Sequence, residues 1–180
     1  MRAAGDQNTK YWMRATPVQM RLLEQACKGK IIIDLGGRDG SLALHLLATG
    51  AKGATNVDHD GTGTRLKGAH LGHFRGTYAE FDAKNPKRRW EVGILSWPVI
   101  YSTMLDPVMP ILDRCEKVIY LGKNSHAIQC GTRRLWRYLV RRQMDASIER
   151  KKAALLIYGG MGRTTRQTEE EYWGLKAIPR

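Results

Sequence analysis

Residues 31–40, which read IIIDLGGRDG, join an apolar run, an acid and a glycine-rich turn in one short stretch. The three isoleucines show no alternation of apolar and polar residues, which is typical of a parallel strand buried on both faces. Gly36, Gly37 and Gly40 can turn the backbone sharply and bring it close to a ligand, where a Cβ atom would collide. The apolar spacing of Ser41–Leu47 predicts a helix whose free N–H groups face the turn. The stretch therefore predicts a small-molecule site.

Further apolar runs carry strand signals and alternate with helical patterns along the chain. They cover residues 53–58, 74–81, 90–96, 117–121 and 153–158. This alternation predicts an α/β, Rossmann-like three-layer sandwich with a mostly parallel sheet and helices on both faces. Six strands are expected, with a seventh only if residues 172–178 supply it. The chain of 180 residues is expected to be one domain, with a leading segment and helix over 1–29 and the sheet core over 30–180.

A second acid, Asp58, ends the second predicted strand. Together with Asp34 and the glycine turn that follows the first strand, it completes a recognisable pattern. The pattern resembles the class I S-adenosylmethionine-dependent methyltransferases. In that family the first acid serves the amino end of the cofactor, the turn lies under its methionine and ribose portion, and the second acid holds the ribose hydroxyls. The resemblance implies that S-adenosyl-L-methionine is the cofactor. It assigns cofactor binding to Asp34, Gly36, Gly37, Gly40 and Asp58.

The turn itself leaves other interpretations open. The resembled family usually has glycine where this chain has Arg38, a long cation beside a cationic cofactor. A glycine-rich turn after a strand also occurs in ordinary strand-to-helix loops. A nicotinamide dinucleotide is a minor alternative, because residues 36–41 do not supply the G-x-G-x-x-G pattern that it requires.

Asp82 follows the predicted strand 74–81 and precedes a small residue. In the resembled family an acid at this place commonly faces the adenine amino group, so the resemblance implies a further cofactor contact at Asp82. The alternative is that Asp82 belongs to a plain turn with Asn85 and Pro86.

Residues 90–99, WEVGILSWPV, are an apolar strand that ends in a small polar residue, an aromatic residue and a proline. Ligands of open α/β sheets bind at this edge. The ending is similar to the fourth motif of the amino methyltransferases, in agreement at Ser96 and Pro98 but not at Trp97 and Val99. In such a catalytic site, Ser96 Oγ and the Trp97 carbonyl would accept hydrogen bonds from a target amine and orient its lone pair. The alternative is that Ser96, Trp97 and Pro98 merely end a strand over the core.

The charge is strongly basic, with 30 Lys and Arg against 17 Asp and Glu and a formal net charge of +13. Such an excess favours a polyanionic partner, although a basic surface can also serve solubility alone. Basic residues gather between Arg133 and Lys152. Arg134, Arg137 and Arg141 share one face of a predicted helix over residues 132–143, so we expect them to contact nucleic acid, either DNA or RNA.

The three cysteines are an odd number without close pairing, which favours reduced thiols over a disulfide framework. No zinc-ligand spacing is present, and we expect His70 and His73 to be solvated on a short polar helix. No window approaches a membrane span, and residues 1–10 carry no apolar signal segment. We therefore expect a cytoplasmic protein with no metal and no membrane partner.

Three functions remain open. The first is an S-adenosylmethionine-dependent methyltransferase acting on an amino group of a nucleic acid. The second is an enzyme of the same class acting on a small molecule or a protein. The third is a non-catalytic nucleic-acid-binding protein on a methyltransferase fold. The side of the sheet on which Arg134, Arg137 and Arg141 lie, relative to Ser96, helps to separate the first two.

Overall fold

A computed structural model of the chain describes residues 17–59, 70–96, 108–122, 132–150 and 153–161. Within them, seven strands form one sheet in the order β3-β2-β1-β4-β5-β7-β6. The strands are β1 (Ile31–Leu35), β2 (Gly53–Asp58), β3 (Leu71–Arg75), β4 (Trp90–Ser96), β5 (Cys115–Gly122), β6 (Arg142–Arg150) and β7 (Ala153–Met161). Strands β1 to β5 run parallel, whereas β7 is antiparallel to β5 and β6 is antiparallel to β7.

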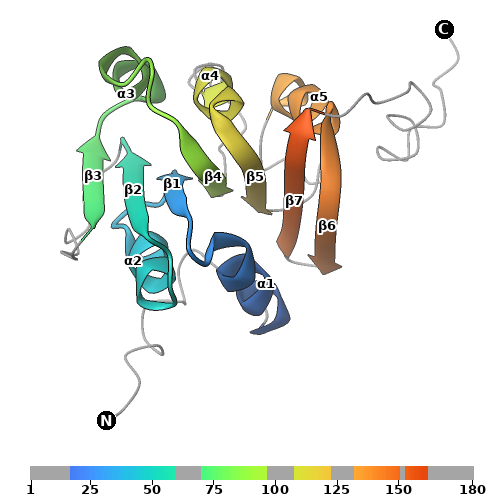
Figure 1. The fold of residues 1–180 in the computed structure, drawn as a ribbon. Coiled ribbons are helices and arrows are strands. Elements are labelled where there is room, and N and C mark those ends of the chain that lie inside the picture. The colour runs from blue at the N-terminus through green and yellow to red at the C-terminus, as the bar shows by residue number, and fades with distance from the viewer. Residues whose placement is uncertain (1–16, 60–69, 97–107, 123–131, 151–152, 162–180) are drawn as a thin grey trace, which may run out of the picture.

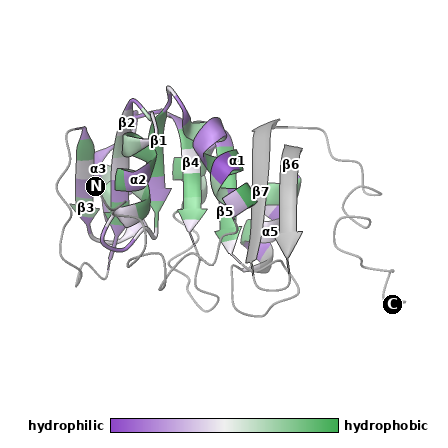
Figure 2. Cartoon of the chain, turned by 90° about the horizontal axis from the view of Figure 1, so that it is seen from below, coloured by the Kyte–Doolittle hydropathy of each residue, from purple (hydrophilic) through white to green (hydrophobic). Residues whose placement is uncertain are grey.

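Helices cover both faces of this sheet. They are α1 (Pro17–Cys27), α2 (Ser41–Ala48), α3 (Tyr78–Lys84), α4 (Val108–Asp113) and α5 (Arg133–Val140). Figure 1 shows α1 and α2 along one face and α3, α4 and α5 along the other. One apolar core lies on each face, the first around Leu23 and Leu42 and the second around Trp90 and Trp136. Figure 2 shows the largely apolar strands β4 and β5 between these layers. The predicted α/β, Rossmann-like sandwich with a mostly parallel sheet is confirmed.

The seventh strand comes from a segment that the sequence interpretation placed partly in a helix. The helix predicted over residues 132–143 begins as expected, because the Thr132 side chain caps α5 by accepting a hydrogen bond from Leu135 N at 3.1 Å. However, α5 ends at Val140, and residues 142–150 form β6, an antiparallel partner of β7. Apolar residues alternate with polar ones over 144–148, which is the period of a strand. Residues 172–178 lie outside the described chain.

The strand predicted over residues 74–81 is wrong beyond Arg75. Thr77 Oγ1 accepts a hydrogen bond from Glu80 N at 3.2 Å, and Glu80 Oε2 accepts one from Thr77 N at 2.7 Å. This reciprocal capping box starts α3 immediately after β3. Asp82 therefore lies on a helix and does not end a strand.

The parallel strands give the sheet two distinct edges. We call the edge at which β1, β2 and β4 end, at Leu35, Asp58 and Ser96, the carboxyl edge. The opposite edge, at which β4 and β5 begin with Trp90 and Cys115, is the amino edge. Open α/β sheets bind ligands at the carboxyl edge, beside the point where the strand order reverses. Here that point lies between β1 and β4.

Candidate functional site

Asp34 is the most deeply buried acid at the carboxyl edge, with none of its surface exposed. Its Oδ1 accepts a 2.8 Å hydrogen bond from the Ser96 hydroxyl, which connects the ends of β1 and β4. Its Oδ2 is buried without a hydrogen-bond partner. The pKa of Asp34 is raised to about 7, mainly by burial; the Ser96 hydrogen bond lowers it, and the Asp58 and Asp39 charges contribute to the rise. A donor or a cation reaching Oδ2 would stabilise the charged carboxylate.

Gly37 lies directly against this carboxylate. A Cβ atom built on Gly37 would collide with Asp34 Oδ2 and with Asn56 Oδ1. The Asn56 oxygen is also buried without a partner, and its amide group donates a 2.9 Å hydrogen bond to Arg38 O. Two unpartnered buried oxygens therefore face the turn at a place where only glycine fits.

The other two glycines of the turn pack against strand ends. Gly36 has φ +84°, and a Cβ atom there would lie 2.8 Å from Ser96 O. Gly40, which immediately precedes α2, also has positive φ, and its Cβ would lie 2.6 Å from a ring carbon of His73. The nearest atoms at both positions belong to the protein. These glycines are required for the turn to pack on β4 and β3, whatever ligand lies above it.

Asp58 and Arg38 are joined through the backbone of the turn. Arg38 N donates a 2.8 Å hydrogen bond to Asp58 Oδ2, and Arg38 has the left-handed φ of 49° that glycine adopts more readily. The Arg38 side chain is exposed and forms no ion pair with an acid in the described part of the chain. Asp58 is only 7% exposed, at the end of β2 as predicted. Arg38 therefore places an exposed cation, without an ion pair to a described acid, at the rim of the carboxyl edge.

Tyr78, Asn56 and His73 also contribute to the site, although the sequence interpretation did not select them. The Tyr78 hydroxyl lies 3.2 Å from the position of a Gly36 Cβ atom. Burial, and then the Asp58 and Asp34 charges, raise the pKa of Tyr78, so its hydroxyl stays protonated as a donor. His73 lies on β3 against Gly40 and is half-buried, so the expectation that it is solvated on a helix is wrong.

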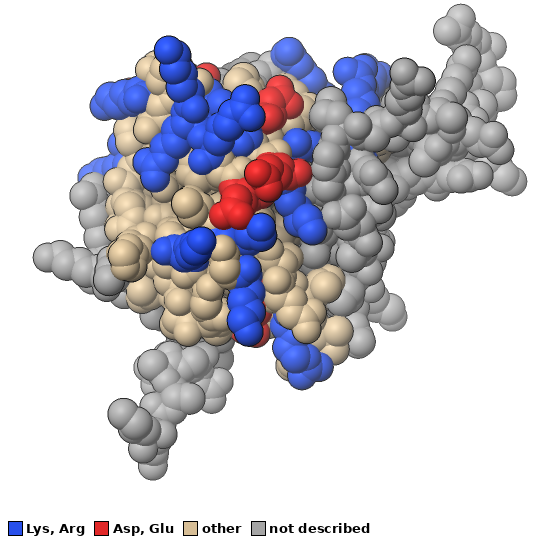
Figure 3. Space-filling view, in the orientation of Figure 1, with Lys and Arg blue, Asp and Glu red and all other residues tan. Residues whose placement is uncertain are grey.

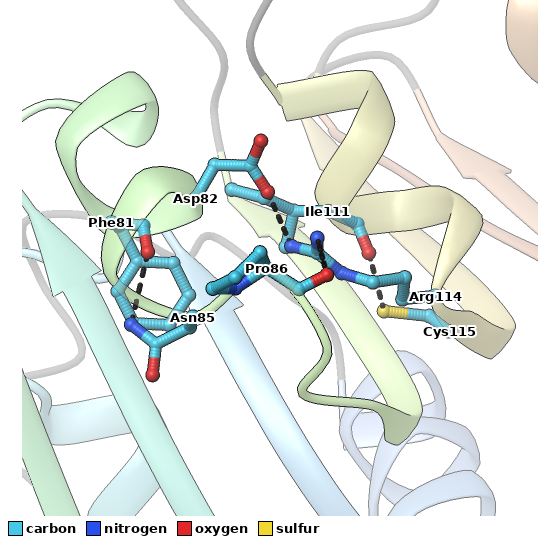
Figure 4. Close-up of polar contacts among 7 residues, drawn as sticks. All are labelled: Phe81, Asp82, Asn85, Pro86, Ile111, Arg114 and Cys115. Carbon is cyan, nitrogen blue, oxygen red and sulfur yellow. Dashed lines mark hydrogen bonds and ion pairs between the residues drawn. The ribbon is translucent and has the colours of Figure 1, made fainter.

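Asp82 is not brought to this site. It forms an ion pair with Arg114, whose guanidinium also donates a 2.9 Å hydrogen bond to Pro86 O (Figure 4). These contacts bind the end of α3 and the following loop to the start of β5. Its predicted contact with adenine required a place at the end of a strand, so we remove Asp82 from the candidate site.

The predicted catalytic and nucleic-acid residues are only partly described. Ser96 ends β4 and is 4% exposed, whereas Trp97 and Pro98 lie outside the described residues. Arg134 and Arg137 are exposed on α5, and Arg141, which directly follows the helix, is exposed as well. This helix ends at the amino edge, because the next residue but one, Arg142, donates a 2.9 Å hydrogen bond to Cys115 O. Arg141 therefore lies near the amino edge, away from Ser96.

The described residues contain no group of three or more His, Cys, Asp or Glu that could hold a metal ion. None of the described helices is long and apolar enough to cross a membrane. Cys27 and Cys115 are free and buried, and burial raises the pKa of each thiol to about 12. Both therefore remain protonated and unreactive at neutral pH.

The chain has the class I, Rossmann-like methyltransferase fold. This fold is recognised by the strand order, the antiparallel β7 and the acids at the carboxyl edge. The sequence itself matches no protein-family model and no curated protein.

Three solved structures illustrate this similarity. A putative RNA methyltransferase, PH1948 from Pyrococcus horikoshii, is 18% identical with a TM-score of 0.58, and the match covers 80% of this chain and 82% of that one. Sp1610 from Streptococcus pneumoniae, a putative tRNA (m1A22) methyltransferase, is 14% identical with a TM-score of 0.58, covering 89% and 77%. The ribosomal protein L11 methylase from Lactobacillus delbrueckii subsp. bulgaricus is 19% identical with a TM-score of 0.59, covering 79% and 76%. At these identities the similarity concerns the fold.

Proposed function

We propose that the chain is an S-adenosylmethionine-dependent methyltransferase that acts on an amino group of a nucleic acid. The observation that carries the proposal is the fully buried Asp34 carboxylate, with Oδ2 unpartnered beneath a glycine turn at the carboxyl edge. A buried, unpaired carboxylate is unfavourable unless a donor or a cation satisfies it. A cationic ligand at this edge would remove that cost.

The described residues fit the amino acid and ribose parts of S-adenosyl-L-methionine. When bound, this cofactor supplies a methyl group on a positively charged sulfur. Asp34 Oδ2 would accept a hydrogen bond from the amino group of the cofactor. This amino group is positively charged and would balance the negative charge of the carboxylate. Asp58, at the end of the neighbouring β2, would accept hydrogen bonds from the ribose hydroxyls. Residues 36–40 would lie beneath the ligand between these two acids.

A nucleic acid is the proposed substrate because of charge. The net charge is +13, and Arg38 places an exposed cation at the rim of the carboxyl edge. Arg134 and Arg137 are exposed on α5, the helix that follows β5. Two structures of the same fold are named for methylation of RNA and tRNA, which supports the same class of substrate here.

Ser96 would connect the acid that holds the cofactor to the amine that receives the methyl group. Its hydroxyl proton is donated to Asp34, but the oxygen retains lone pairs that can accept a hydrogen bond from the target amine. We propose that the Trp97 carbonyl accepts the second N–H of that amine and that Pro98 stiffens the turn. For an in-line transfer, the protein then supplies proximity and orientation.

Methyl transfer from labelled cofactor to a panel of substrates tests this function. The panel contains total tRNA, ribosomal RNA, double-stranded DNA and a cell protein extract, each with the wild-type chain and with Asp58→Ala. We expect label in RNA or DNA, and much less with Asp58→Ala. Label confined to protein would contradict the nucleic-acid substrate, and no label in any fraction would contradict the enzymatic function.

A further inference from the structure

Exposed cations gather at the amino edge, far from the candidate cofactor site. Figure 3 shows many Lys and Arg side chains over the part of the molecule that carries α3 and the start of β4, with a smaller group of acidic side chains beside them. The densest group lies on the last turn of α3 and on the loop that leads to β4. It consists of Lys84, Lys87, Arg88 and Arg89, all exposed, which we call the α3–β4 basic cluster.

The loop that carries this cluster is held in place on its inner side. Arg114 binds it at Asp82 and at Pro86 O, and Asn85 Nδ2 donates a 2.9 Å hydrogen bond to Phe81 O (Figure 4). Because these contacts fix both ends of the segment 82–86, the cations that follow leave the loop in a defined direction. Ordering them on a ligand therefore costs less conformational entropy than ordering a free loop.

Two of the cations are also held against aromatic rings. The Arg88 guanidinium lies 5.5 Å from the centre of the Trp90 ring and donates a 3.3 Å hydrogen bond to Thr55 Oγ1. The Lys84 ammonium lies 5.3 Å from the centre of the Phe74 ring. Contact with a ring orients a cation without neutralising its charge.

No acid in the described part of the chain offsets this charge by ion pairing with the cluster. Of the acids on the same segment, Asp82 is paired with Arg114, and Glu80 caps α3 through Thr77, although its charge also interacts with that of Lys84. None of the four cluster cations forms an ion pair with another described residue. The cluster is therefore a preorganised cationic surface that is available to an anion.

We propose that the α3–β4 basic cluster binds the phosphodiester backbone of a nucleic acid that extends past the carboxyl edge. Lys ammonium and planar Arg guanidinium groups are the side chains that pair with phosphates in such complexes. The cluster precedes β4, and Ser96 ends it, so the seven residues of β4 separate the two regions by about 23 Å. Duplex phosphates repeat about every 3.4 Å along each strand, so roughly seven nucleotides span that distance. The inference rests on the proposed nucleic-acid substrate and adds a second, remote anchor for it.

Two matched variants test this anchor. In the first, Lys84, Lys87 and Arg89 are replaced by Gln, with Arg88 retained because it contacts Trp90 and Thr55. In the control, Arg21, Lys28 and Lys52 are replaced by Gln. Arg21 lies on α1, and Lys28 and Lys52 precede β1 and β2; all three are exposed and none forms an ion pair with a described acid. Both variants lose the same charge. Thermal melting checks that both remain folded.

Binding is measured by fluorescence anisotropy with labelled RNA and DNA duplexes of about 24 base pairs, between about 50 and 200 mM salt. The cluster variant should bind the long duplexes at least about tenfold more weakly, with the slope of log affinity against log salt reduced by about two to three. The control variant should change the slope by less than about one. A single strand of about five nucleotides is too short to reach both regions, so its affinity should differ less between the two variants than that of the duplexes.

Equal losses in the two variants would overturn the proposal, because net charge alone would then explain binding. Failure of the wild-type chain to bind either duplex at low salt would overturn it as well. Cofactor titration separates this proposal from the enzymatic one. A wild-type chain that binds duplex through the cluster but binds no S-adenosylmethionine would support the anchor and contradict the methyltransferase function.

Discussion

The Ser96 hydroxyl donates a 2.8 Å hydrogen bond to Asp34 Oδ1, which connects the end of β4 to β1 beneath the glycine turn. Burial alone would favour the neutral form of this carboxyl group, and the hydrogen bond favours the charged form. The resulting pKa of about 7 places the ionisation of Asp34 in the neutral range. Its charge is therefore sensitive to one neighbouring hydroxyl.

Removal of this hydroxyl should move the pH dependence of cofactor binding. Without the Ser96 bond the pKa of Asp34 rises further, so the carboxylate that the cofactor needs forms only at higher pH. Ser96→Ala should weaken S-adenosylmethionine about tenfold at pH 7 and recover part of the loss toward pH 9. Calorimetric titration from pH 6 to 9 measures this shift, with Ser96→Thr as the variant that keeps a hydroxyl. Parallel profiles for Ser96→Ala and the wild-type chain would disprove the coupling.

Asp34 should lower the stability of the ligand-free protein while it supports binding. Its pKa in the folded state, about 7, lies above the ordinary value near 3.8. Between these values the folded state binds a proton that the unfolded state lacks, so the free energy of unfolding falls as the pH rises, and above about pH 7 the loss is complete. The Asp34→Asn variant has no group that ionises at this position, so it avoids this loss of stability. At pH 8 its free energy of unfolding should exceed that of the wild-type chain by roughly 1–3 kcal/mol.

Urea unfolding without cofactor, at pH 5 and pH 8, measures that difference, which should shrink at the lower pH. The same variant should bind S-adenosylmethionine at least about tenfold more weakly at pH 8, since it cannot carry the negative charge. An Asn variant that is less stable at both pH values, or that binds the cofactor normally, would argue against a ligand-binding role for Asp34.

Arg38→Gly should leave the turn intact. The residue has a left-handed φ of 49°, which glycine adopts without strain, and both of its described contacts use backbone atoms. We expect the free energy of unfolding to change by less than about 1 kcal/mol and cofactor affinity to stay within a few-fold. Nucleic-acid affinity should fall and its salt dependence should decrease by about one phosphate contact. Loss of cofactor binding in this variant would instead make Arg38 a cofactor ligand.

The acids of the carboxyl edge were predictable because each directly follows a buried apolar strand. The runs before Asp34 and Asp58 place both residues where parallel strands end, and only their local order was needed. Asp82 was misplaced because Phe74 and Phe81 suggested one continuous strand. The capping residues Thr77 and Glu80, which start α3 between them, were the local signal against that interpretation.

The remaining contacts depend on long-range packing that the sequence pattern does not carry. Asn56 is a polar residue inside a buried strand, a signal that the sequence interpretation did not use, and its hydrogen bond to Arg38 O requires the turn to fold over β2. Tyr78 reaches Gly36 only because α3 packs beside the end of β4. The hydroxyl of Ser96 was predicted at the carboxyl edge, whereas its donation to Asp34 follows from the pairing of β1 with β4.

Calorimetric titration of S-adenosylmethionine into the wild-type chain and Asp58→Ala at pH 8 tests the central claim most directly. A carboxylate that accepts ribose hydroxyls contributes about 1.5–3 kcal/mol per hydrogen bond, so the variant should lose at least about tenfold in affinity while it remains folded. The account predicts saturable binding of one cofactor per wild-type chain and this loss in the variant. A folded wild-type chain that binds no cofactor, or an Asp58→Ala variant with unchanged affinity, would contradict it.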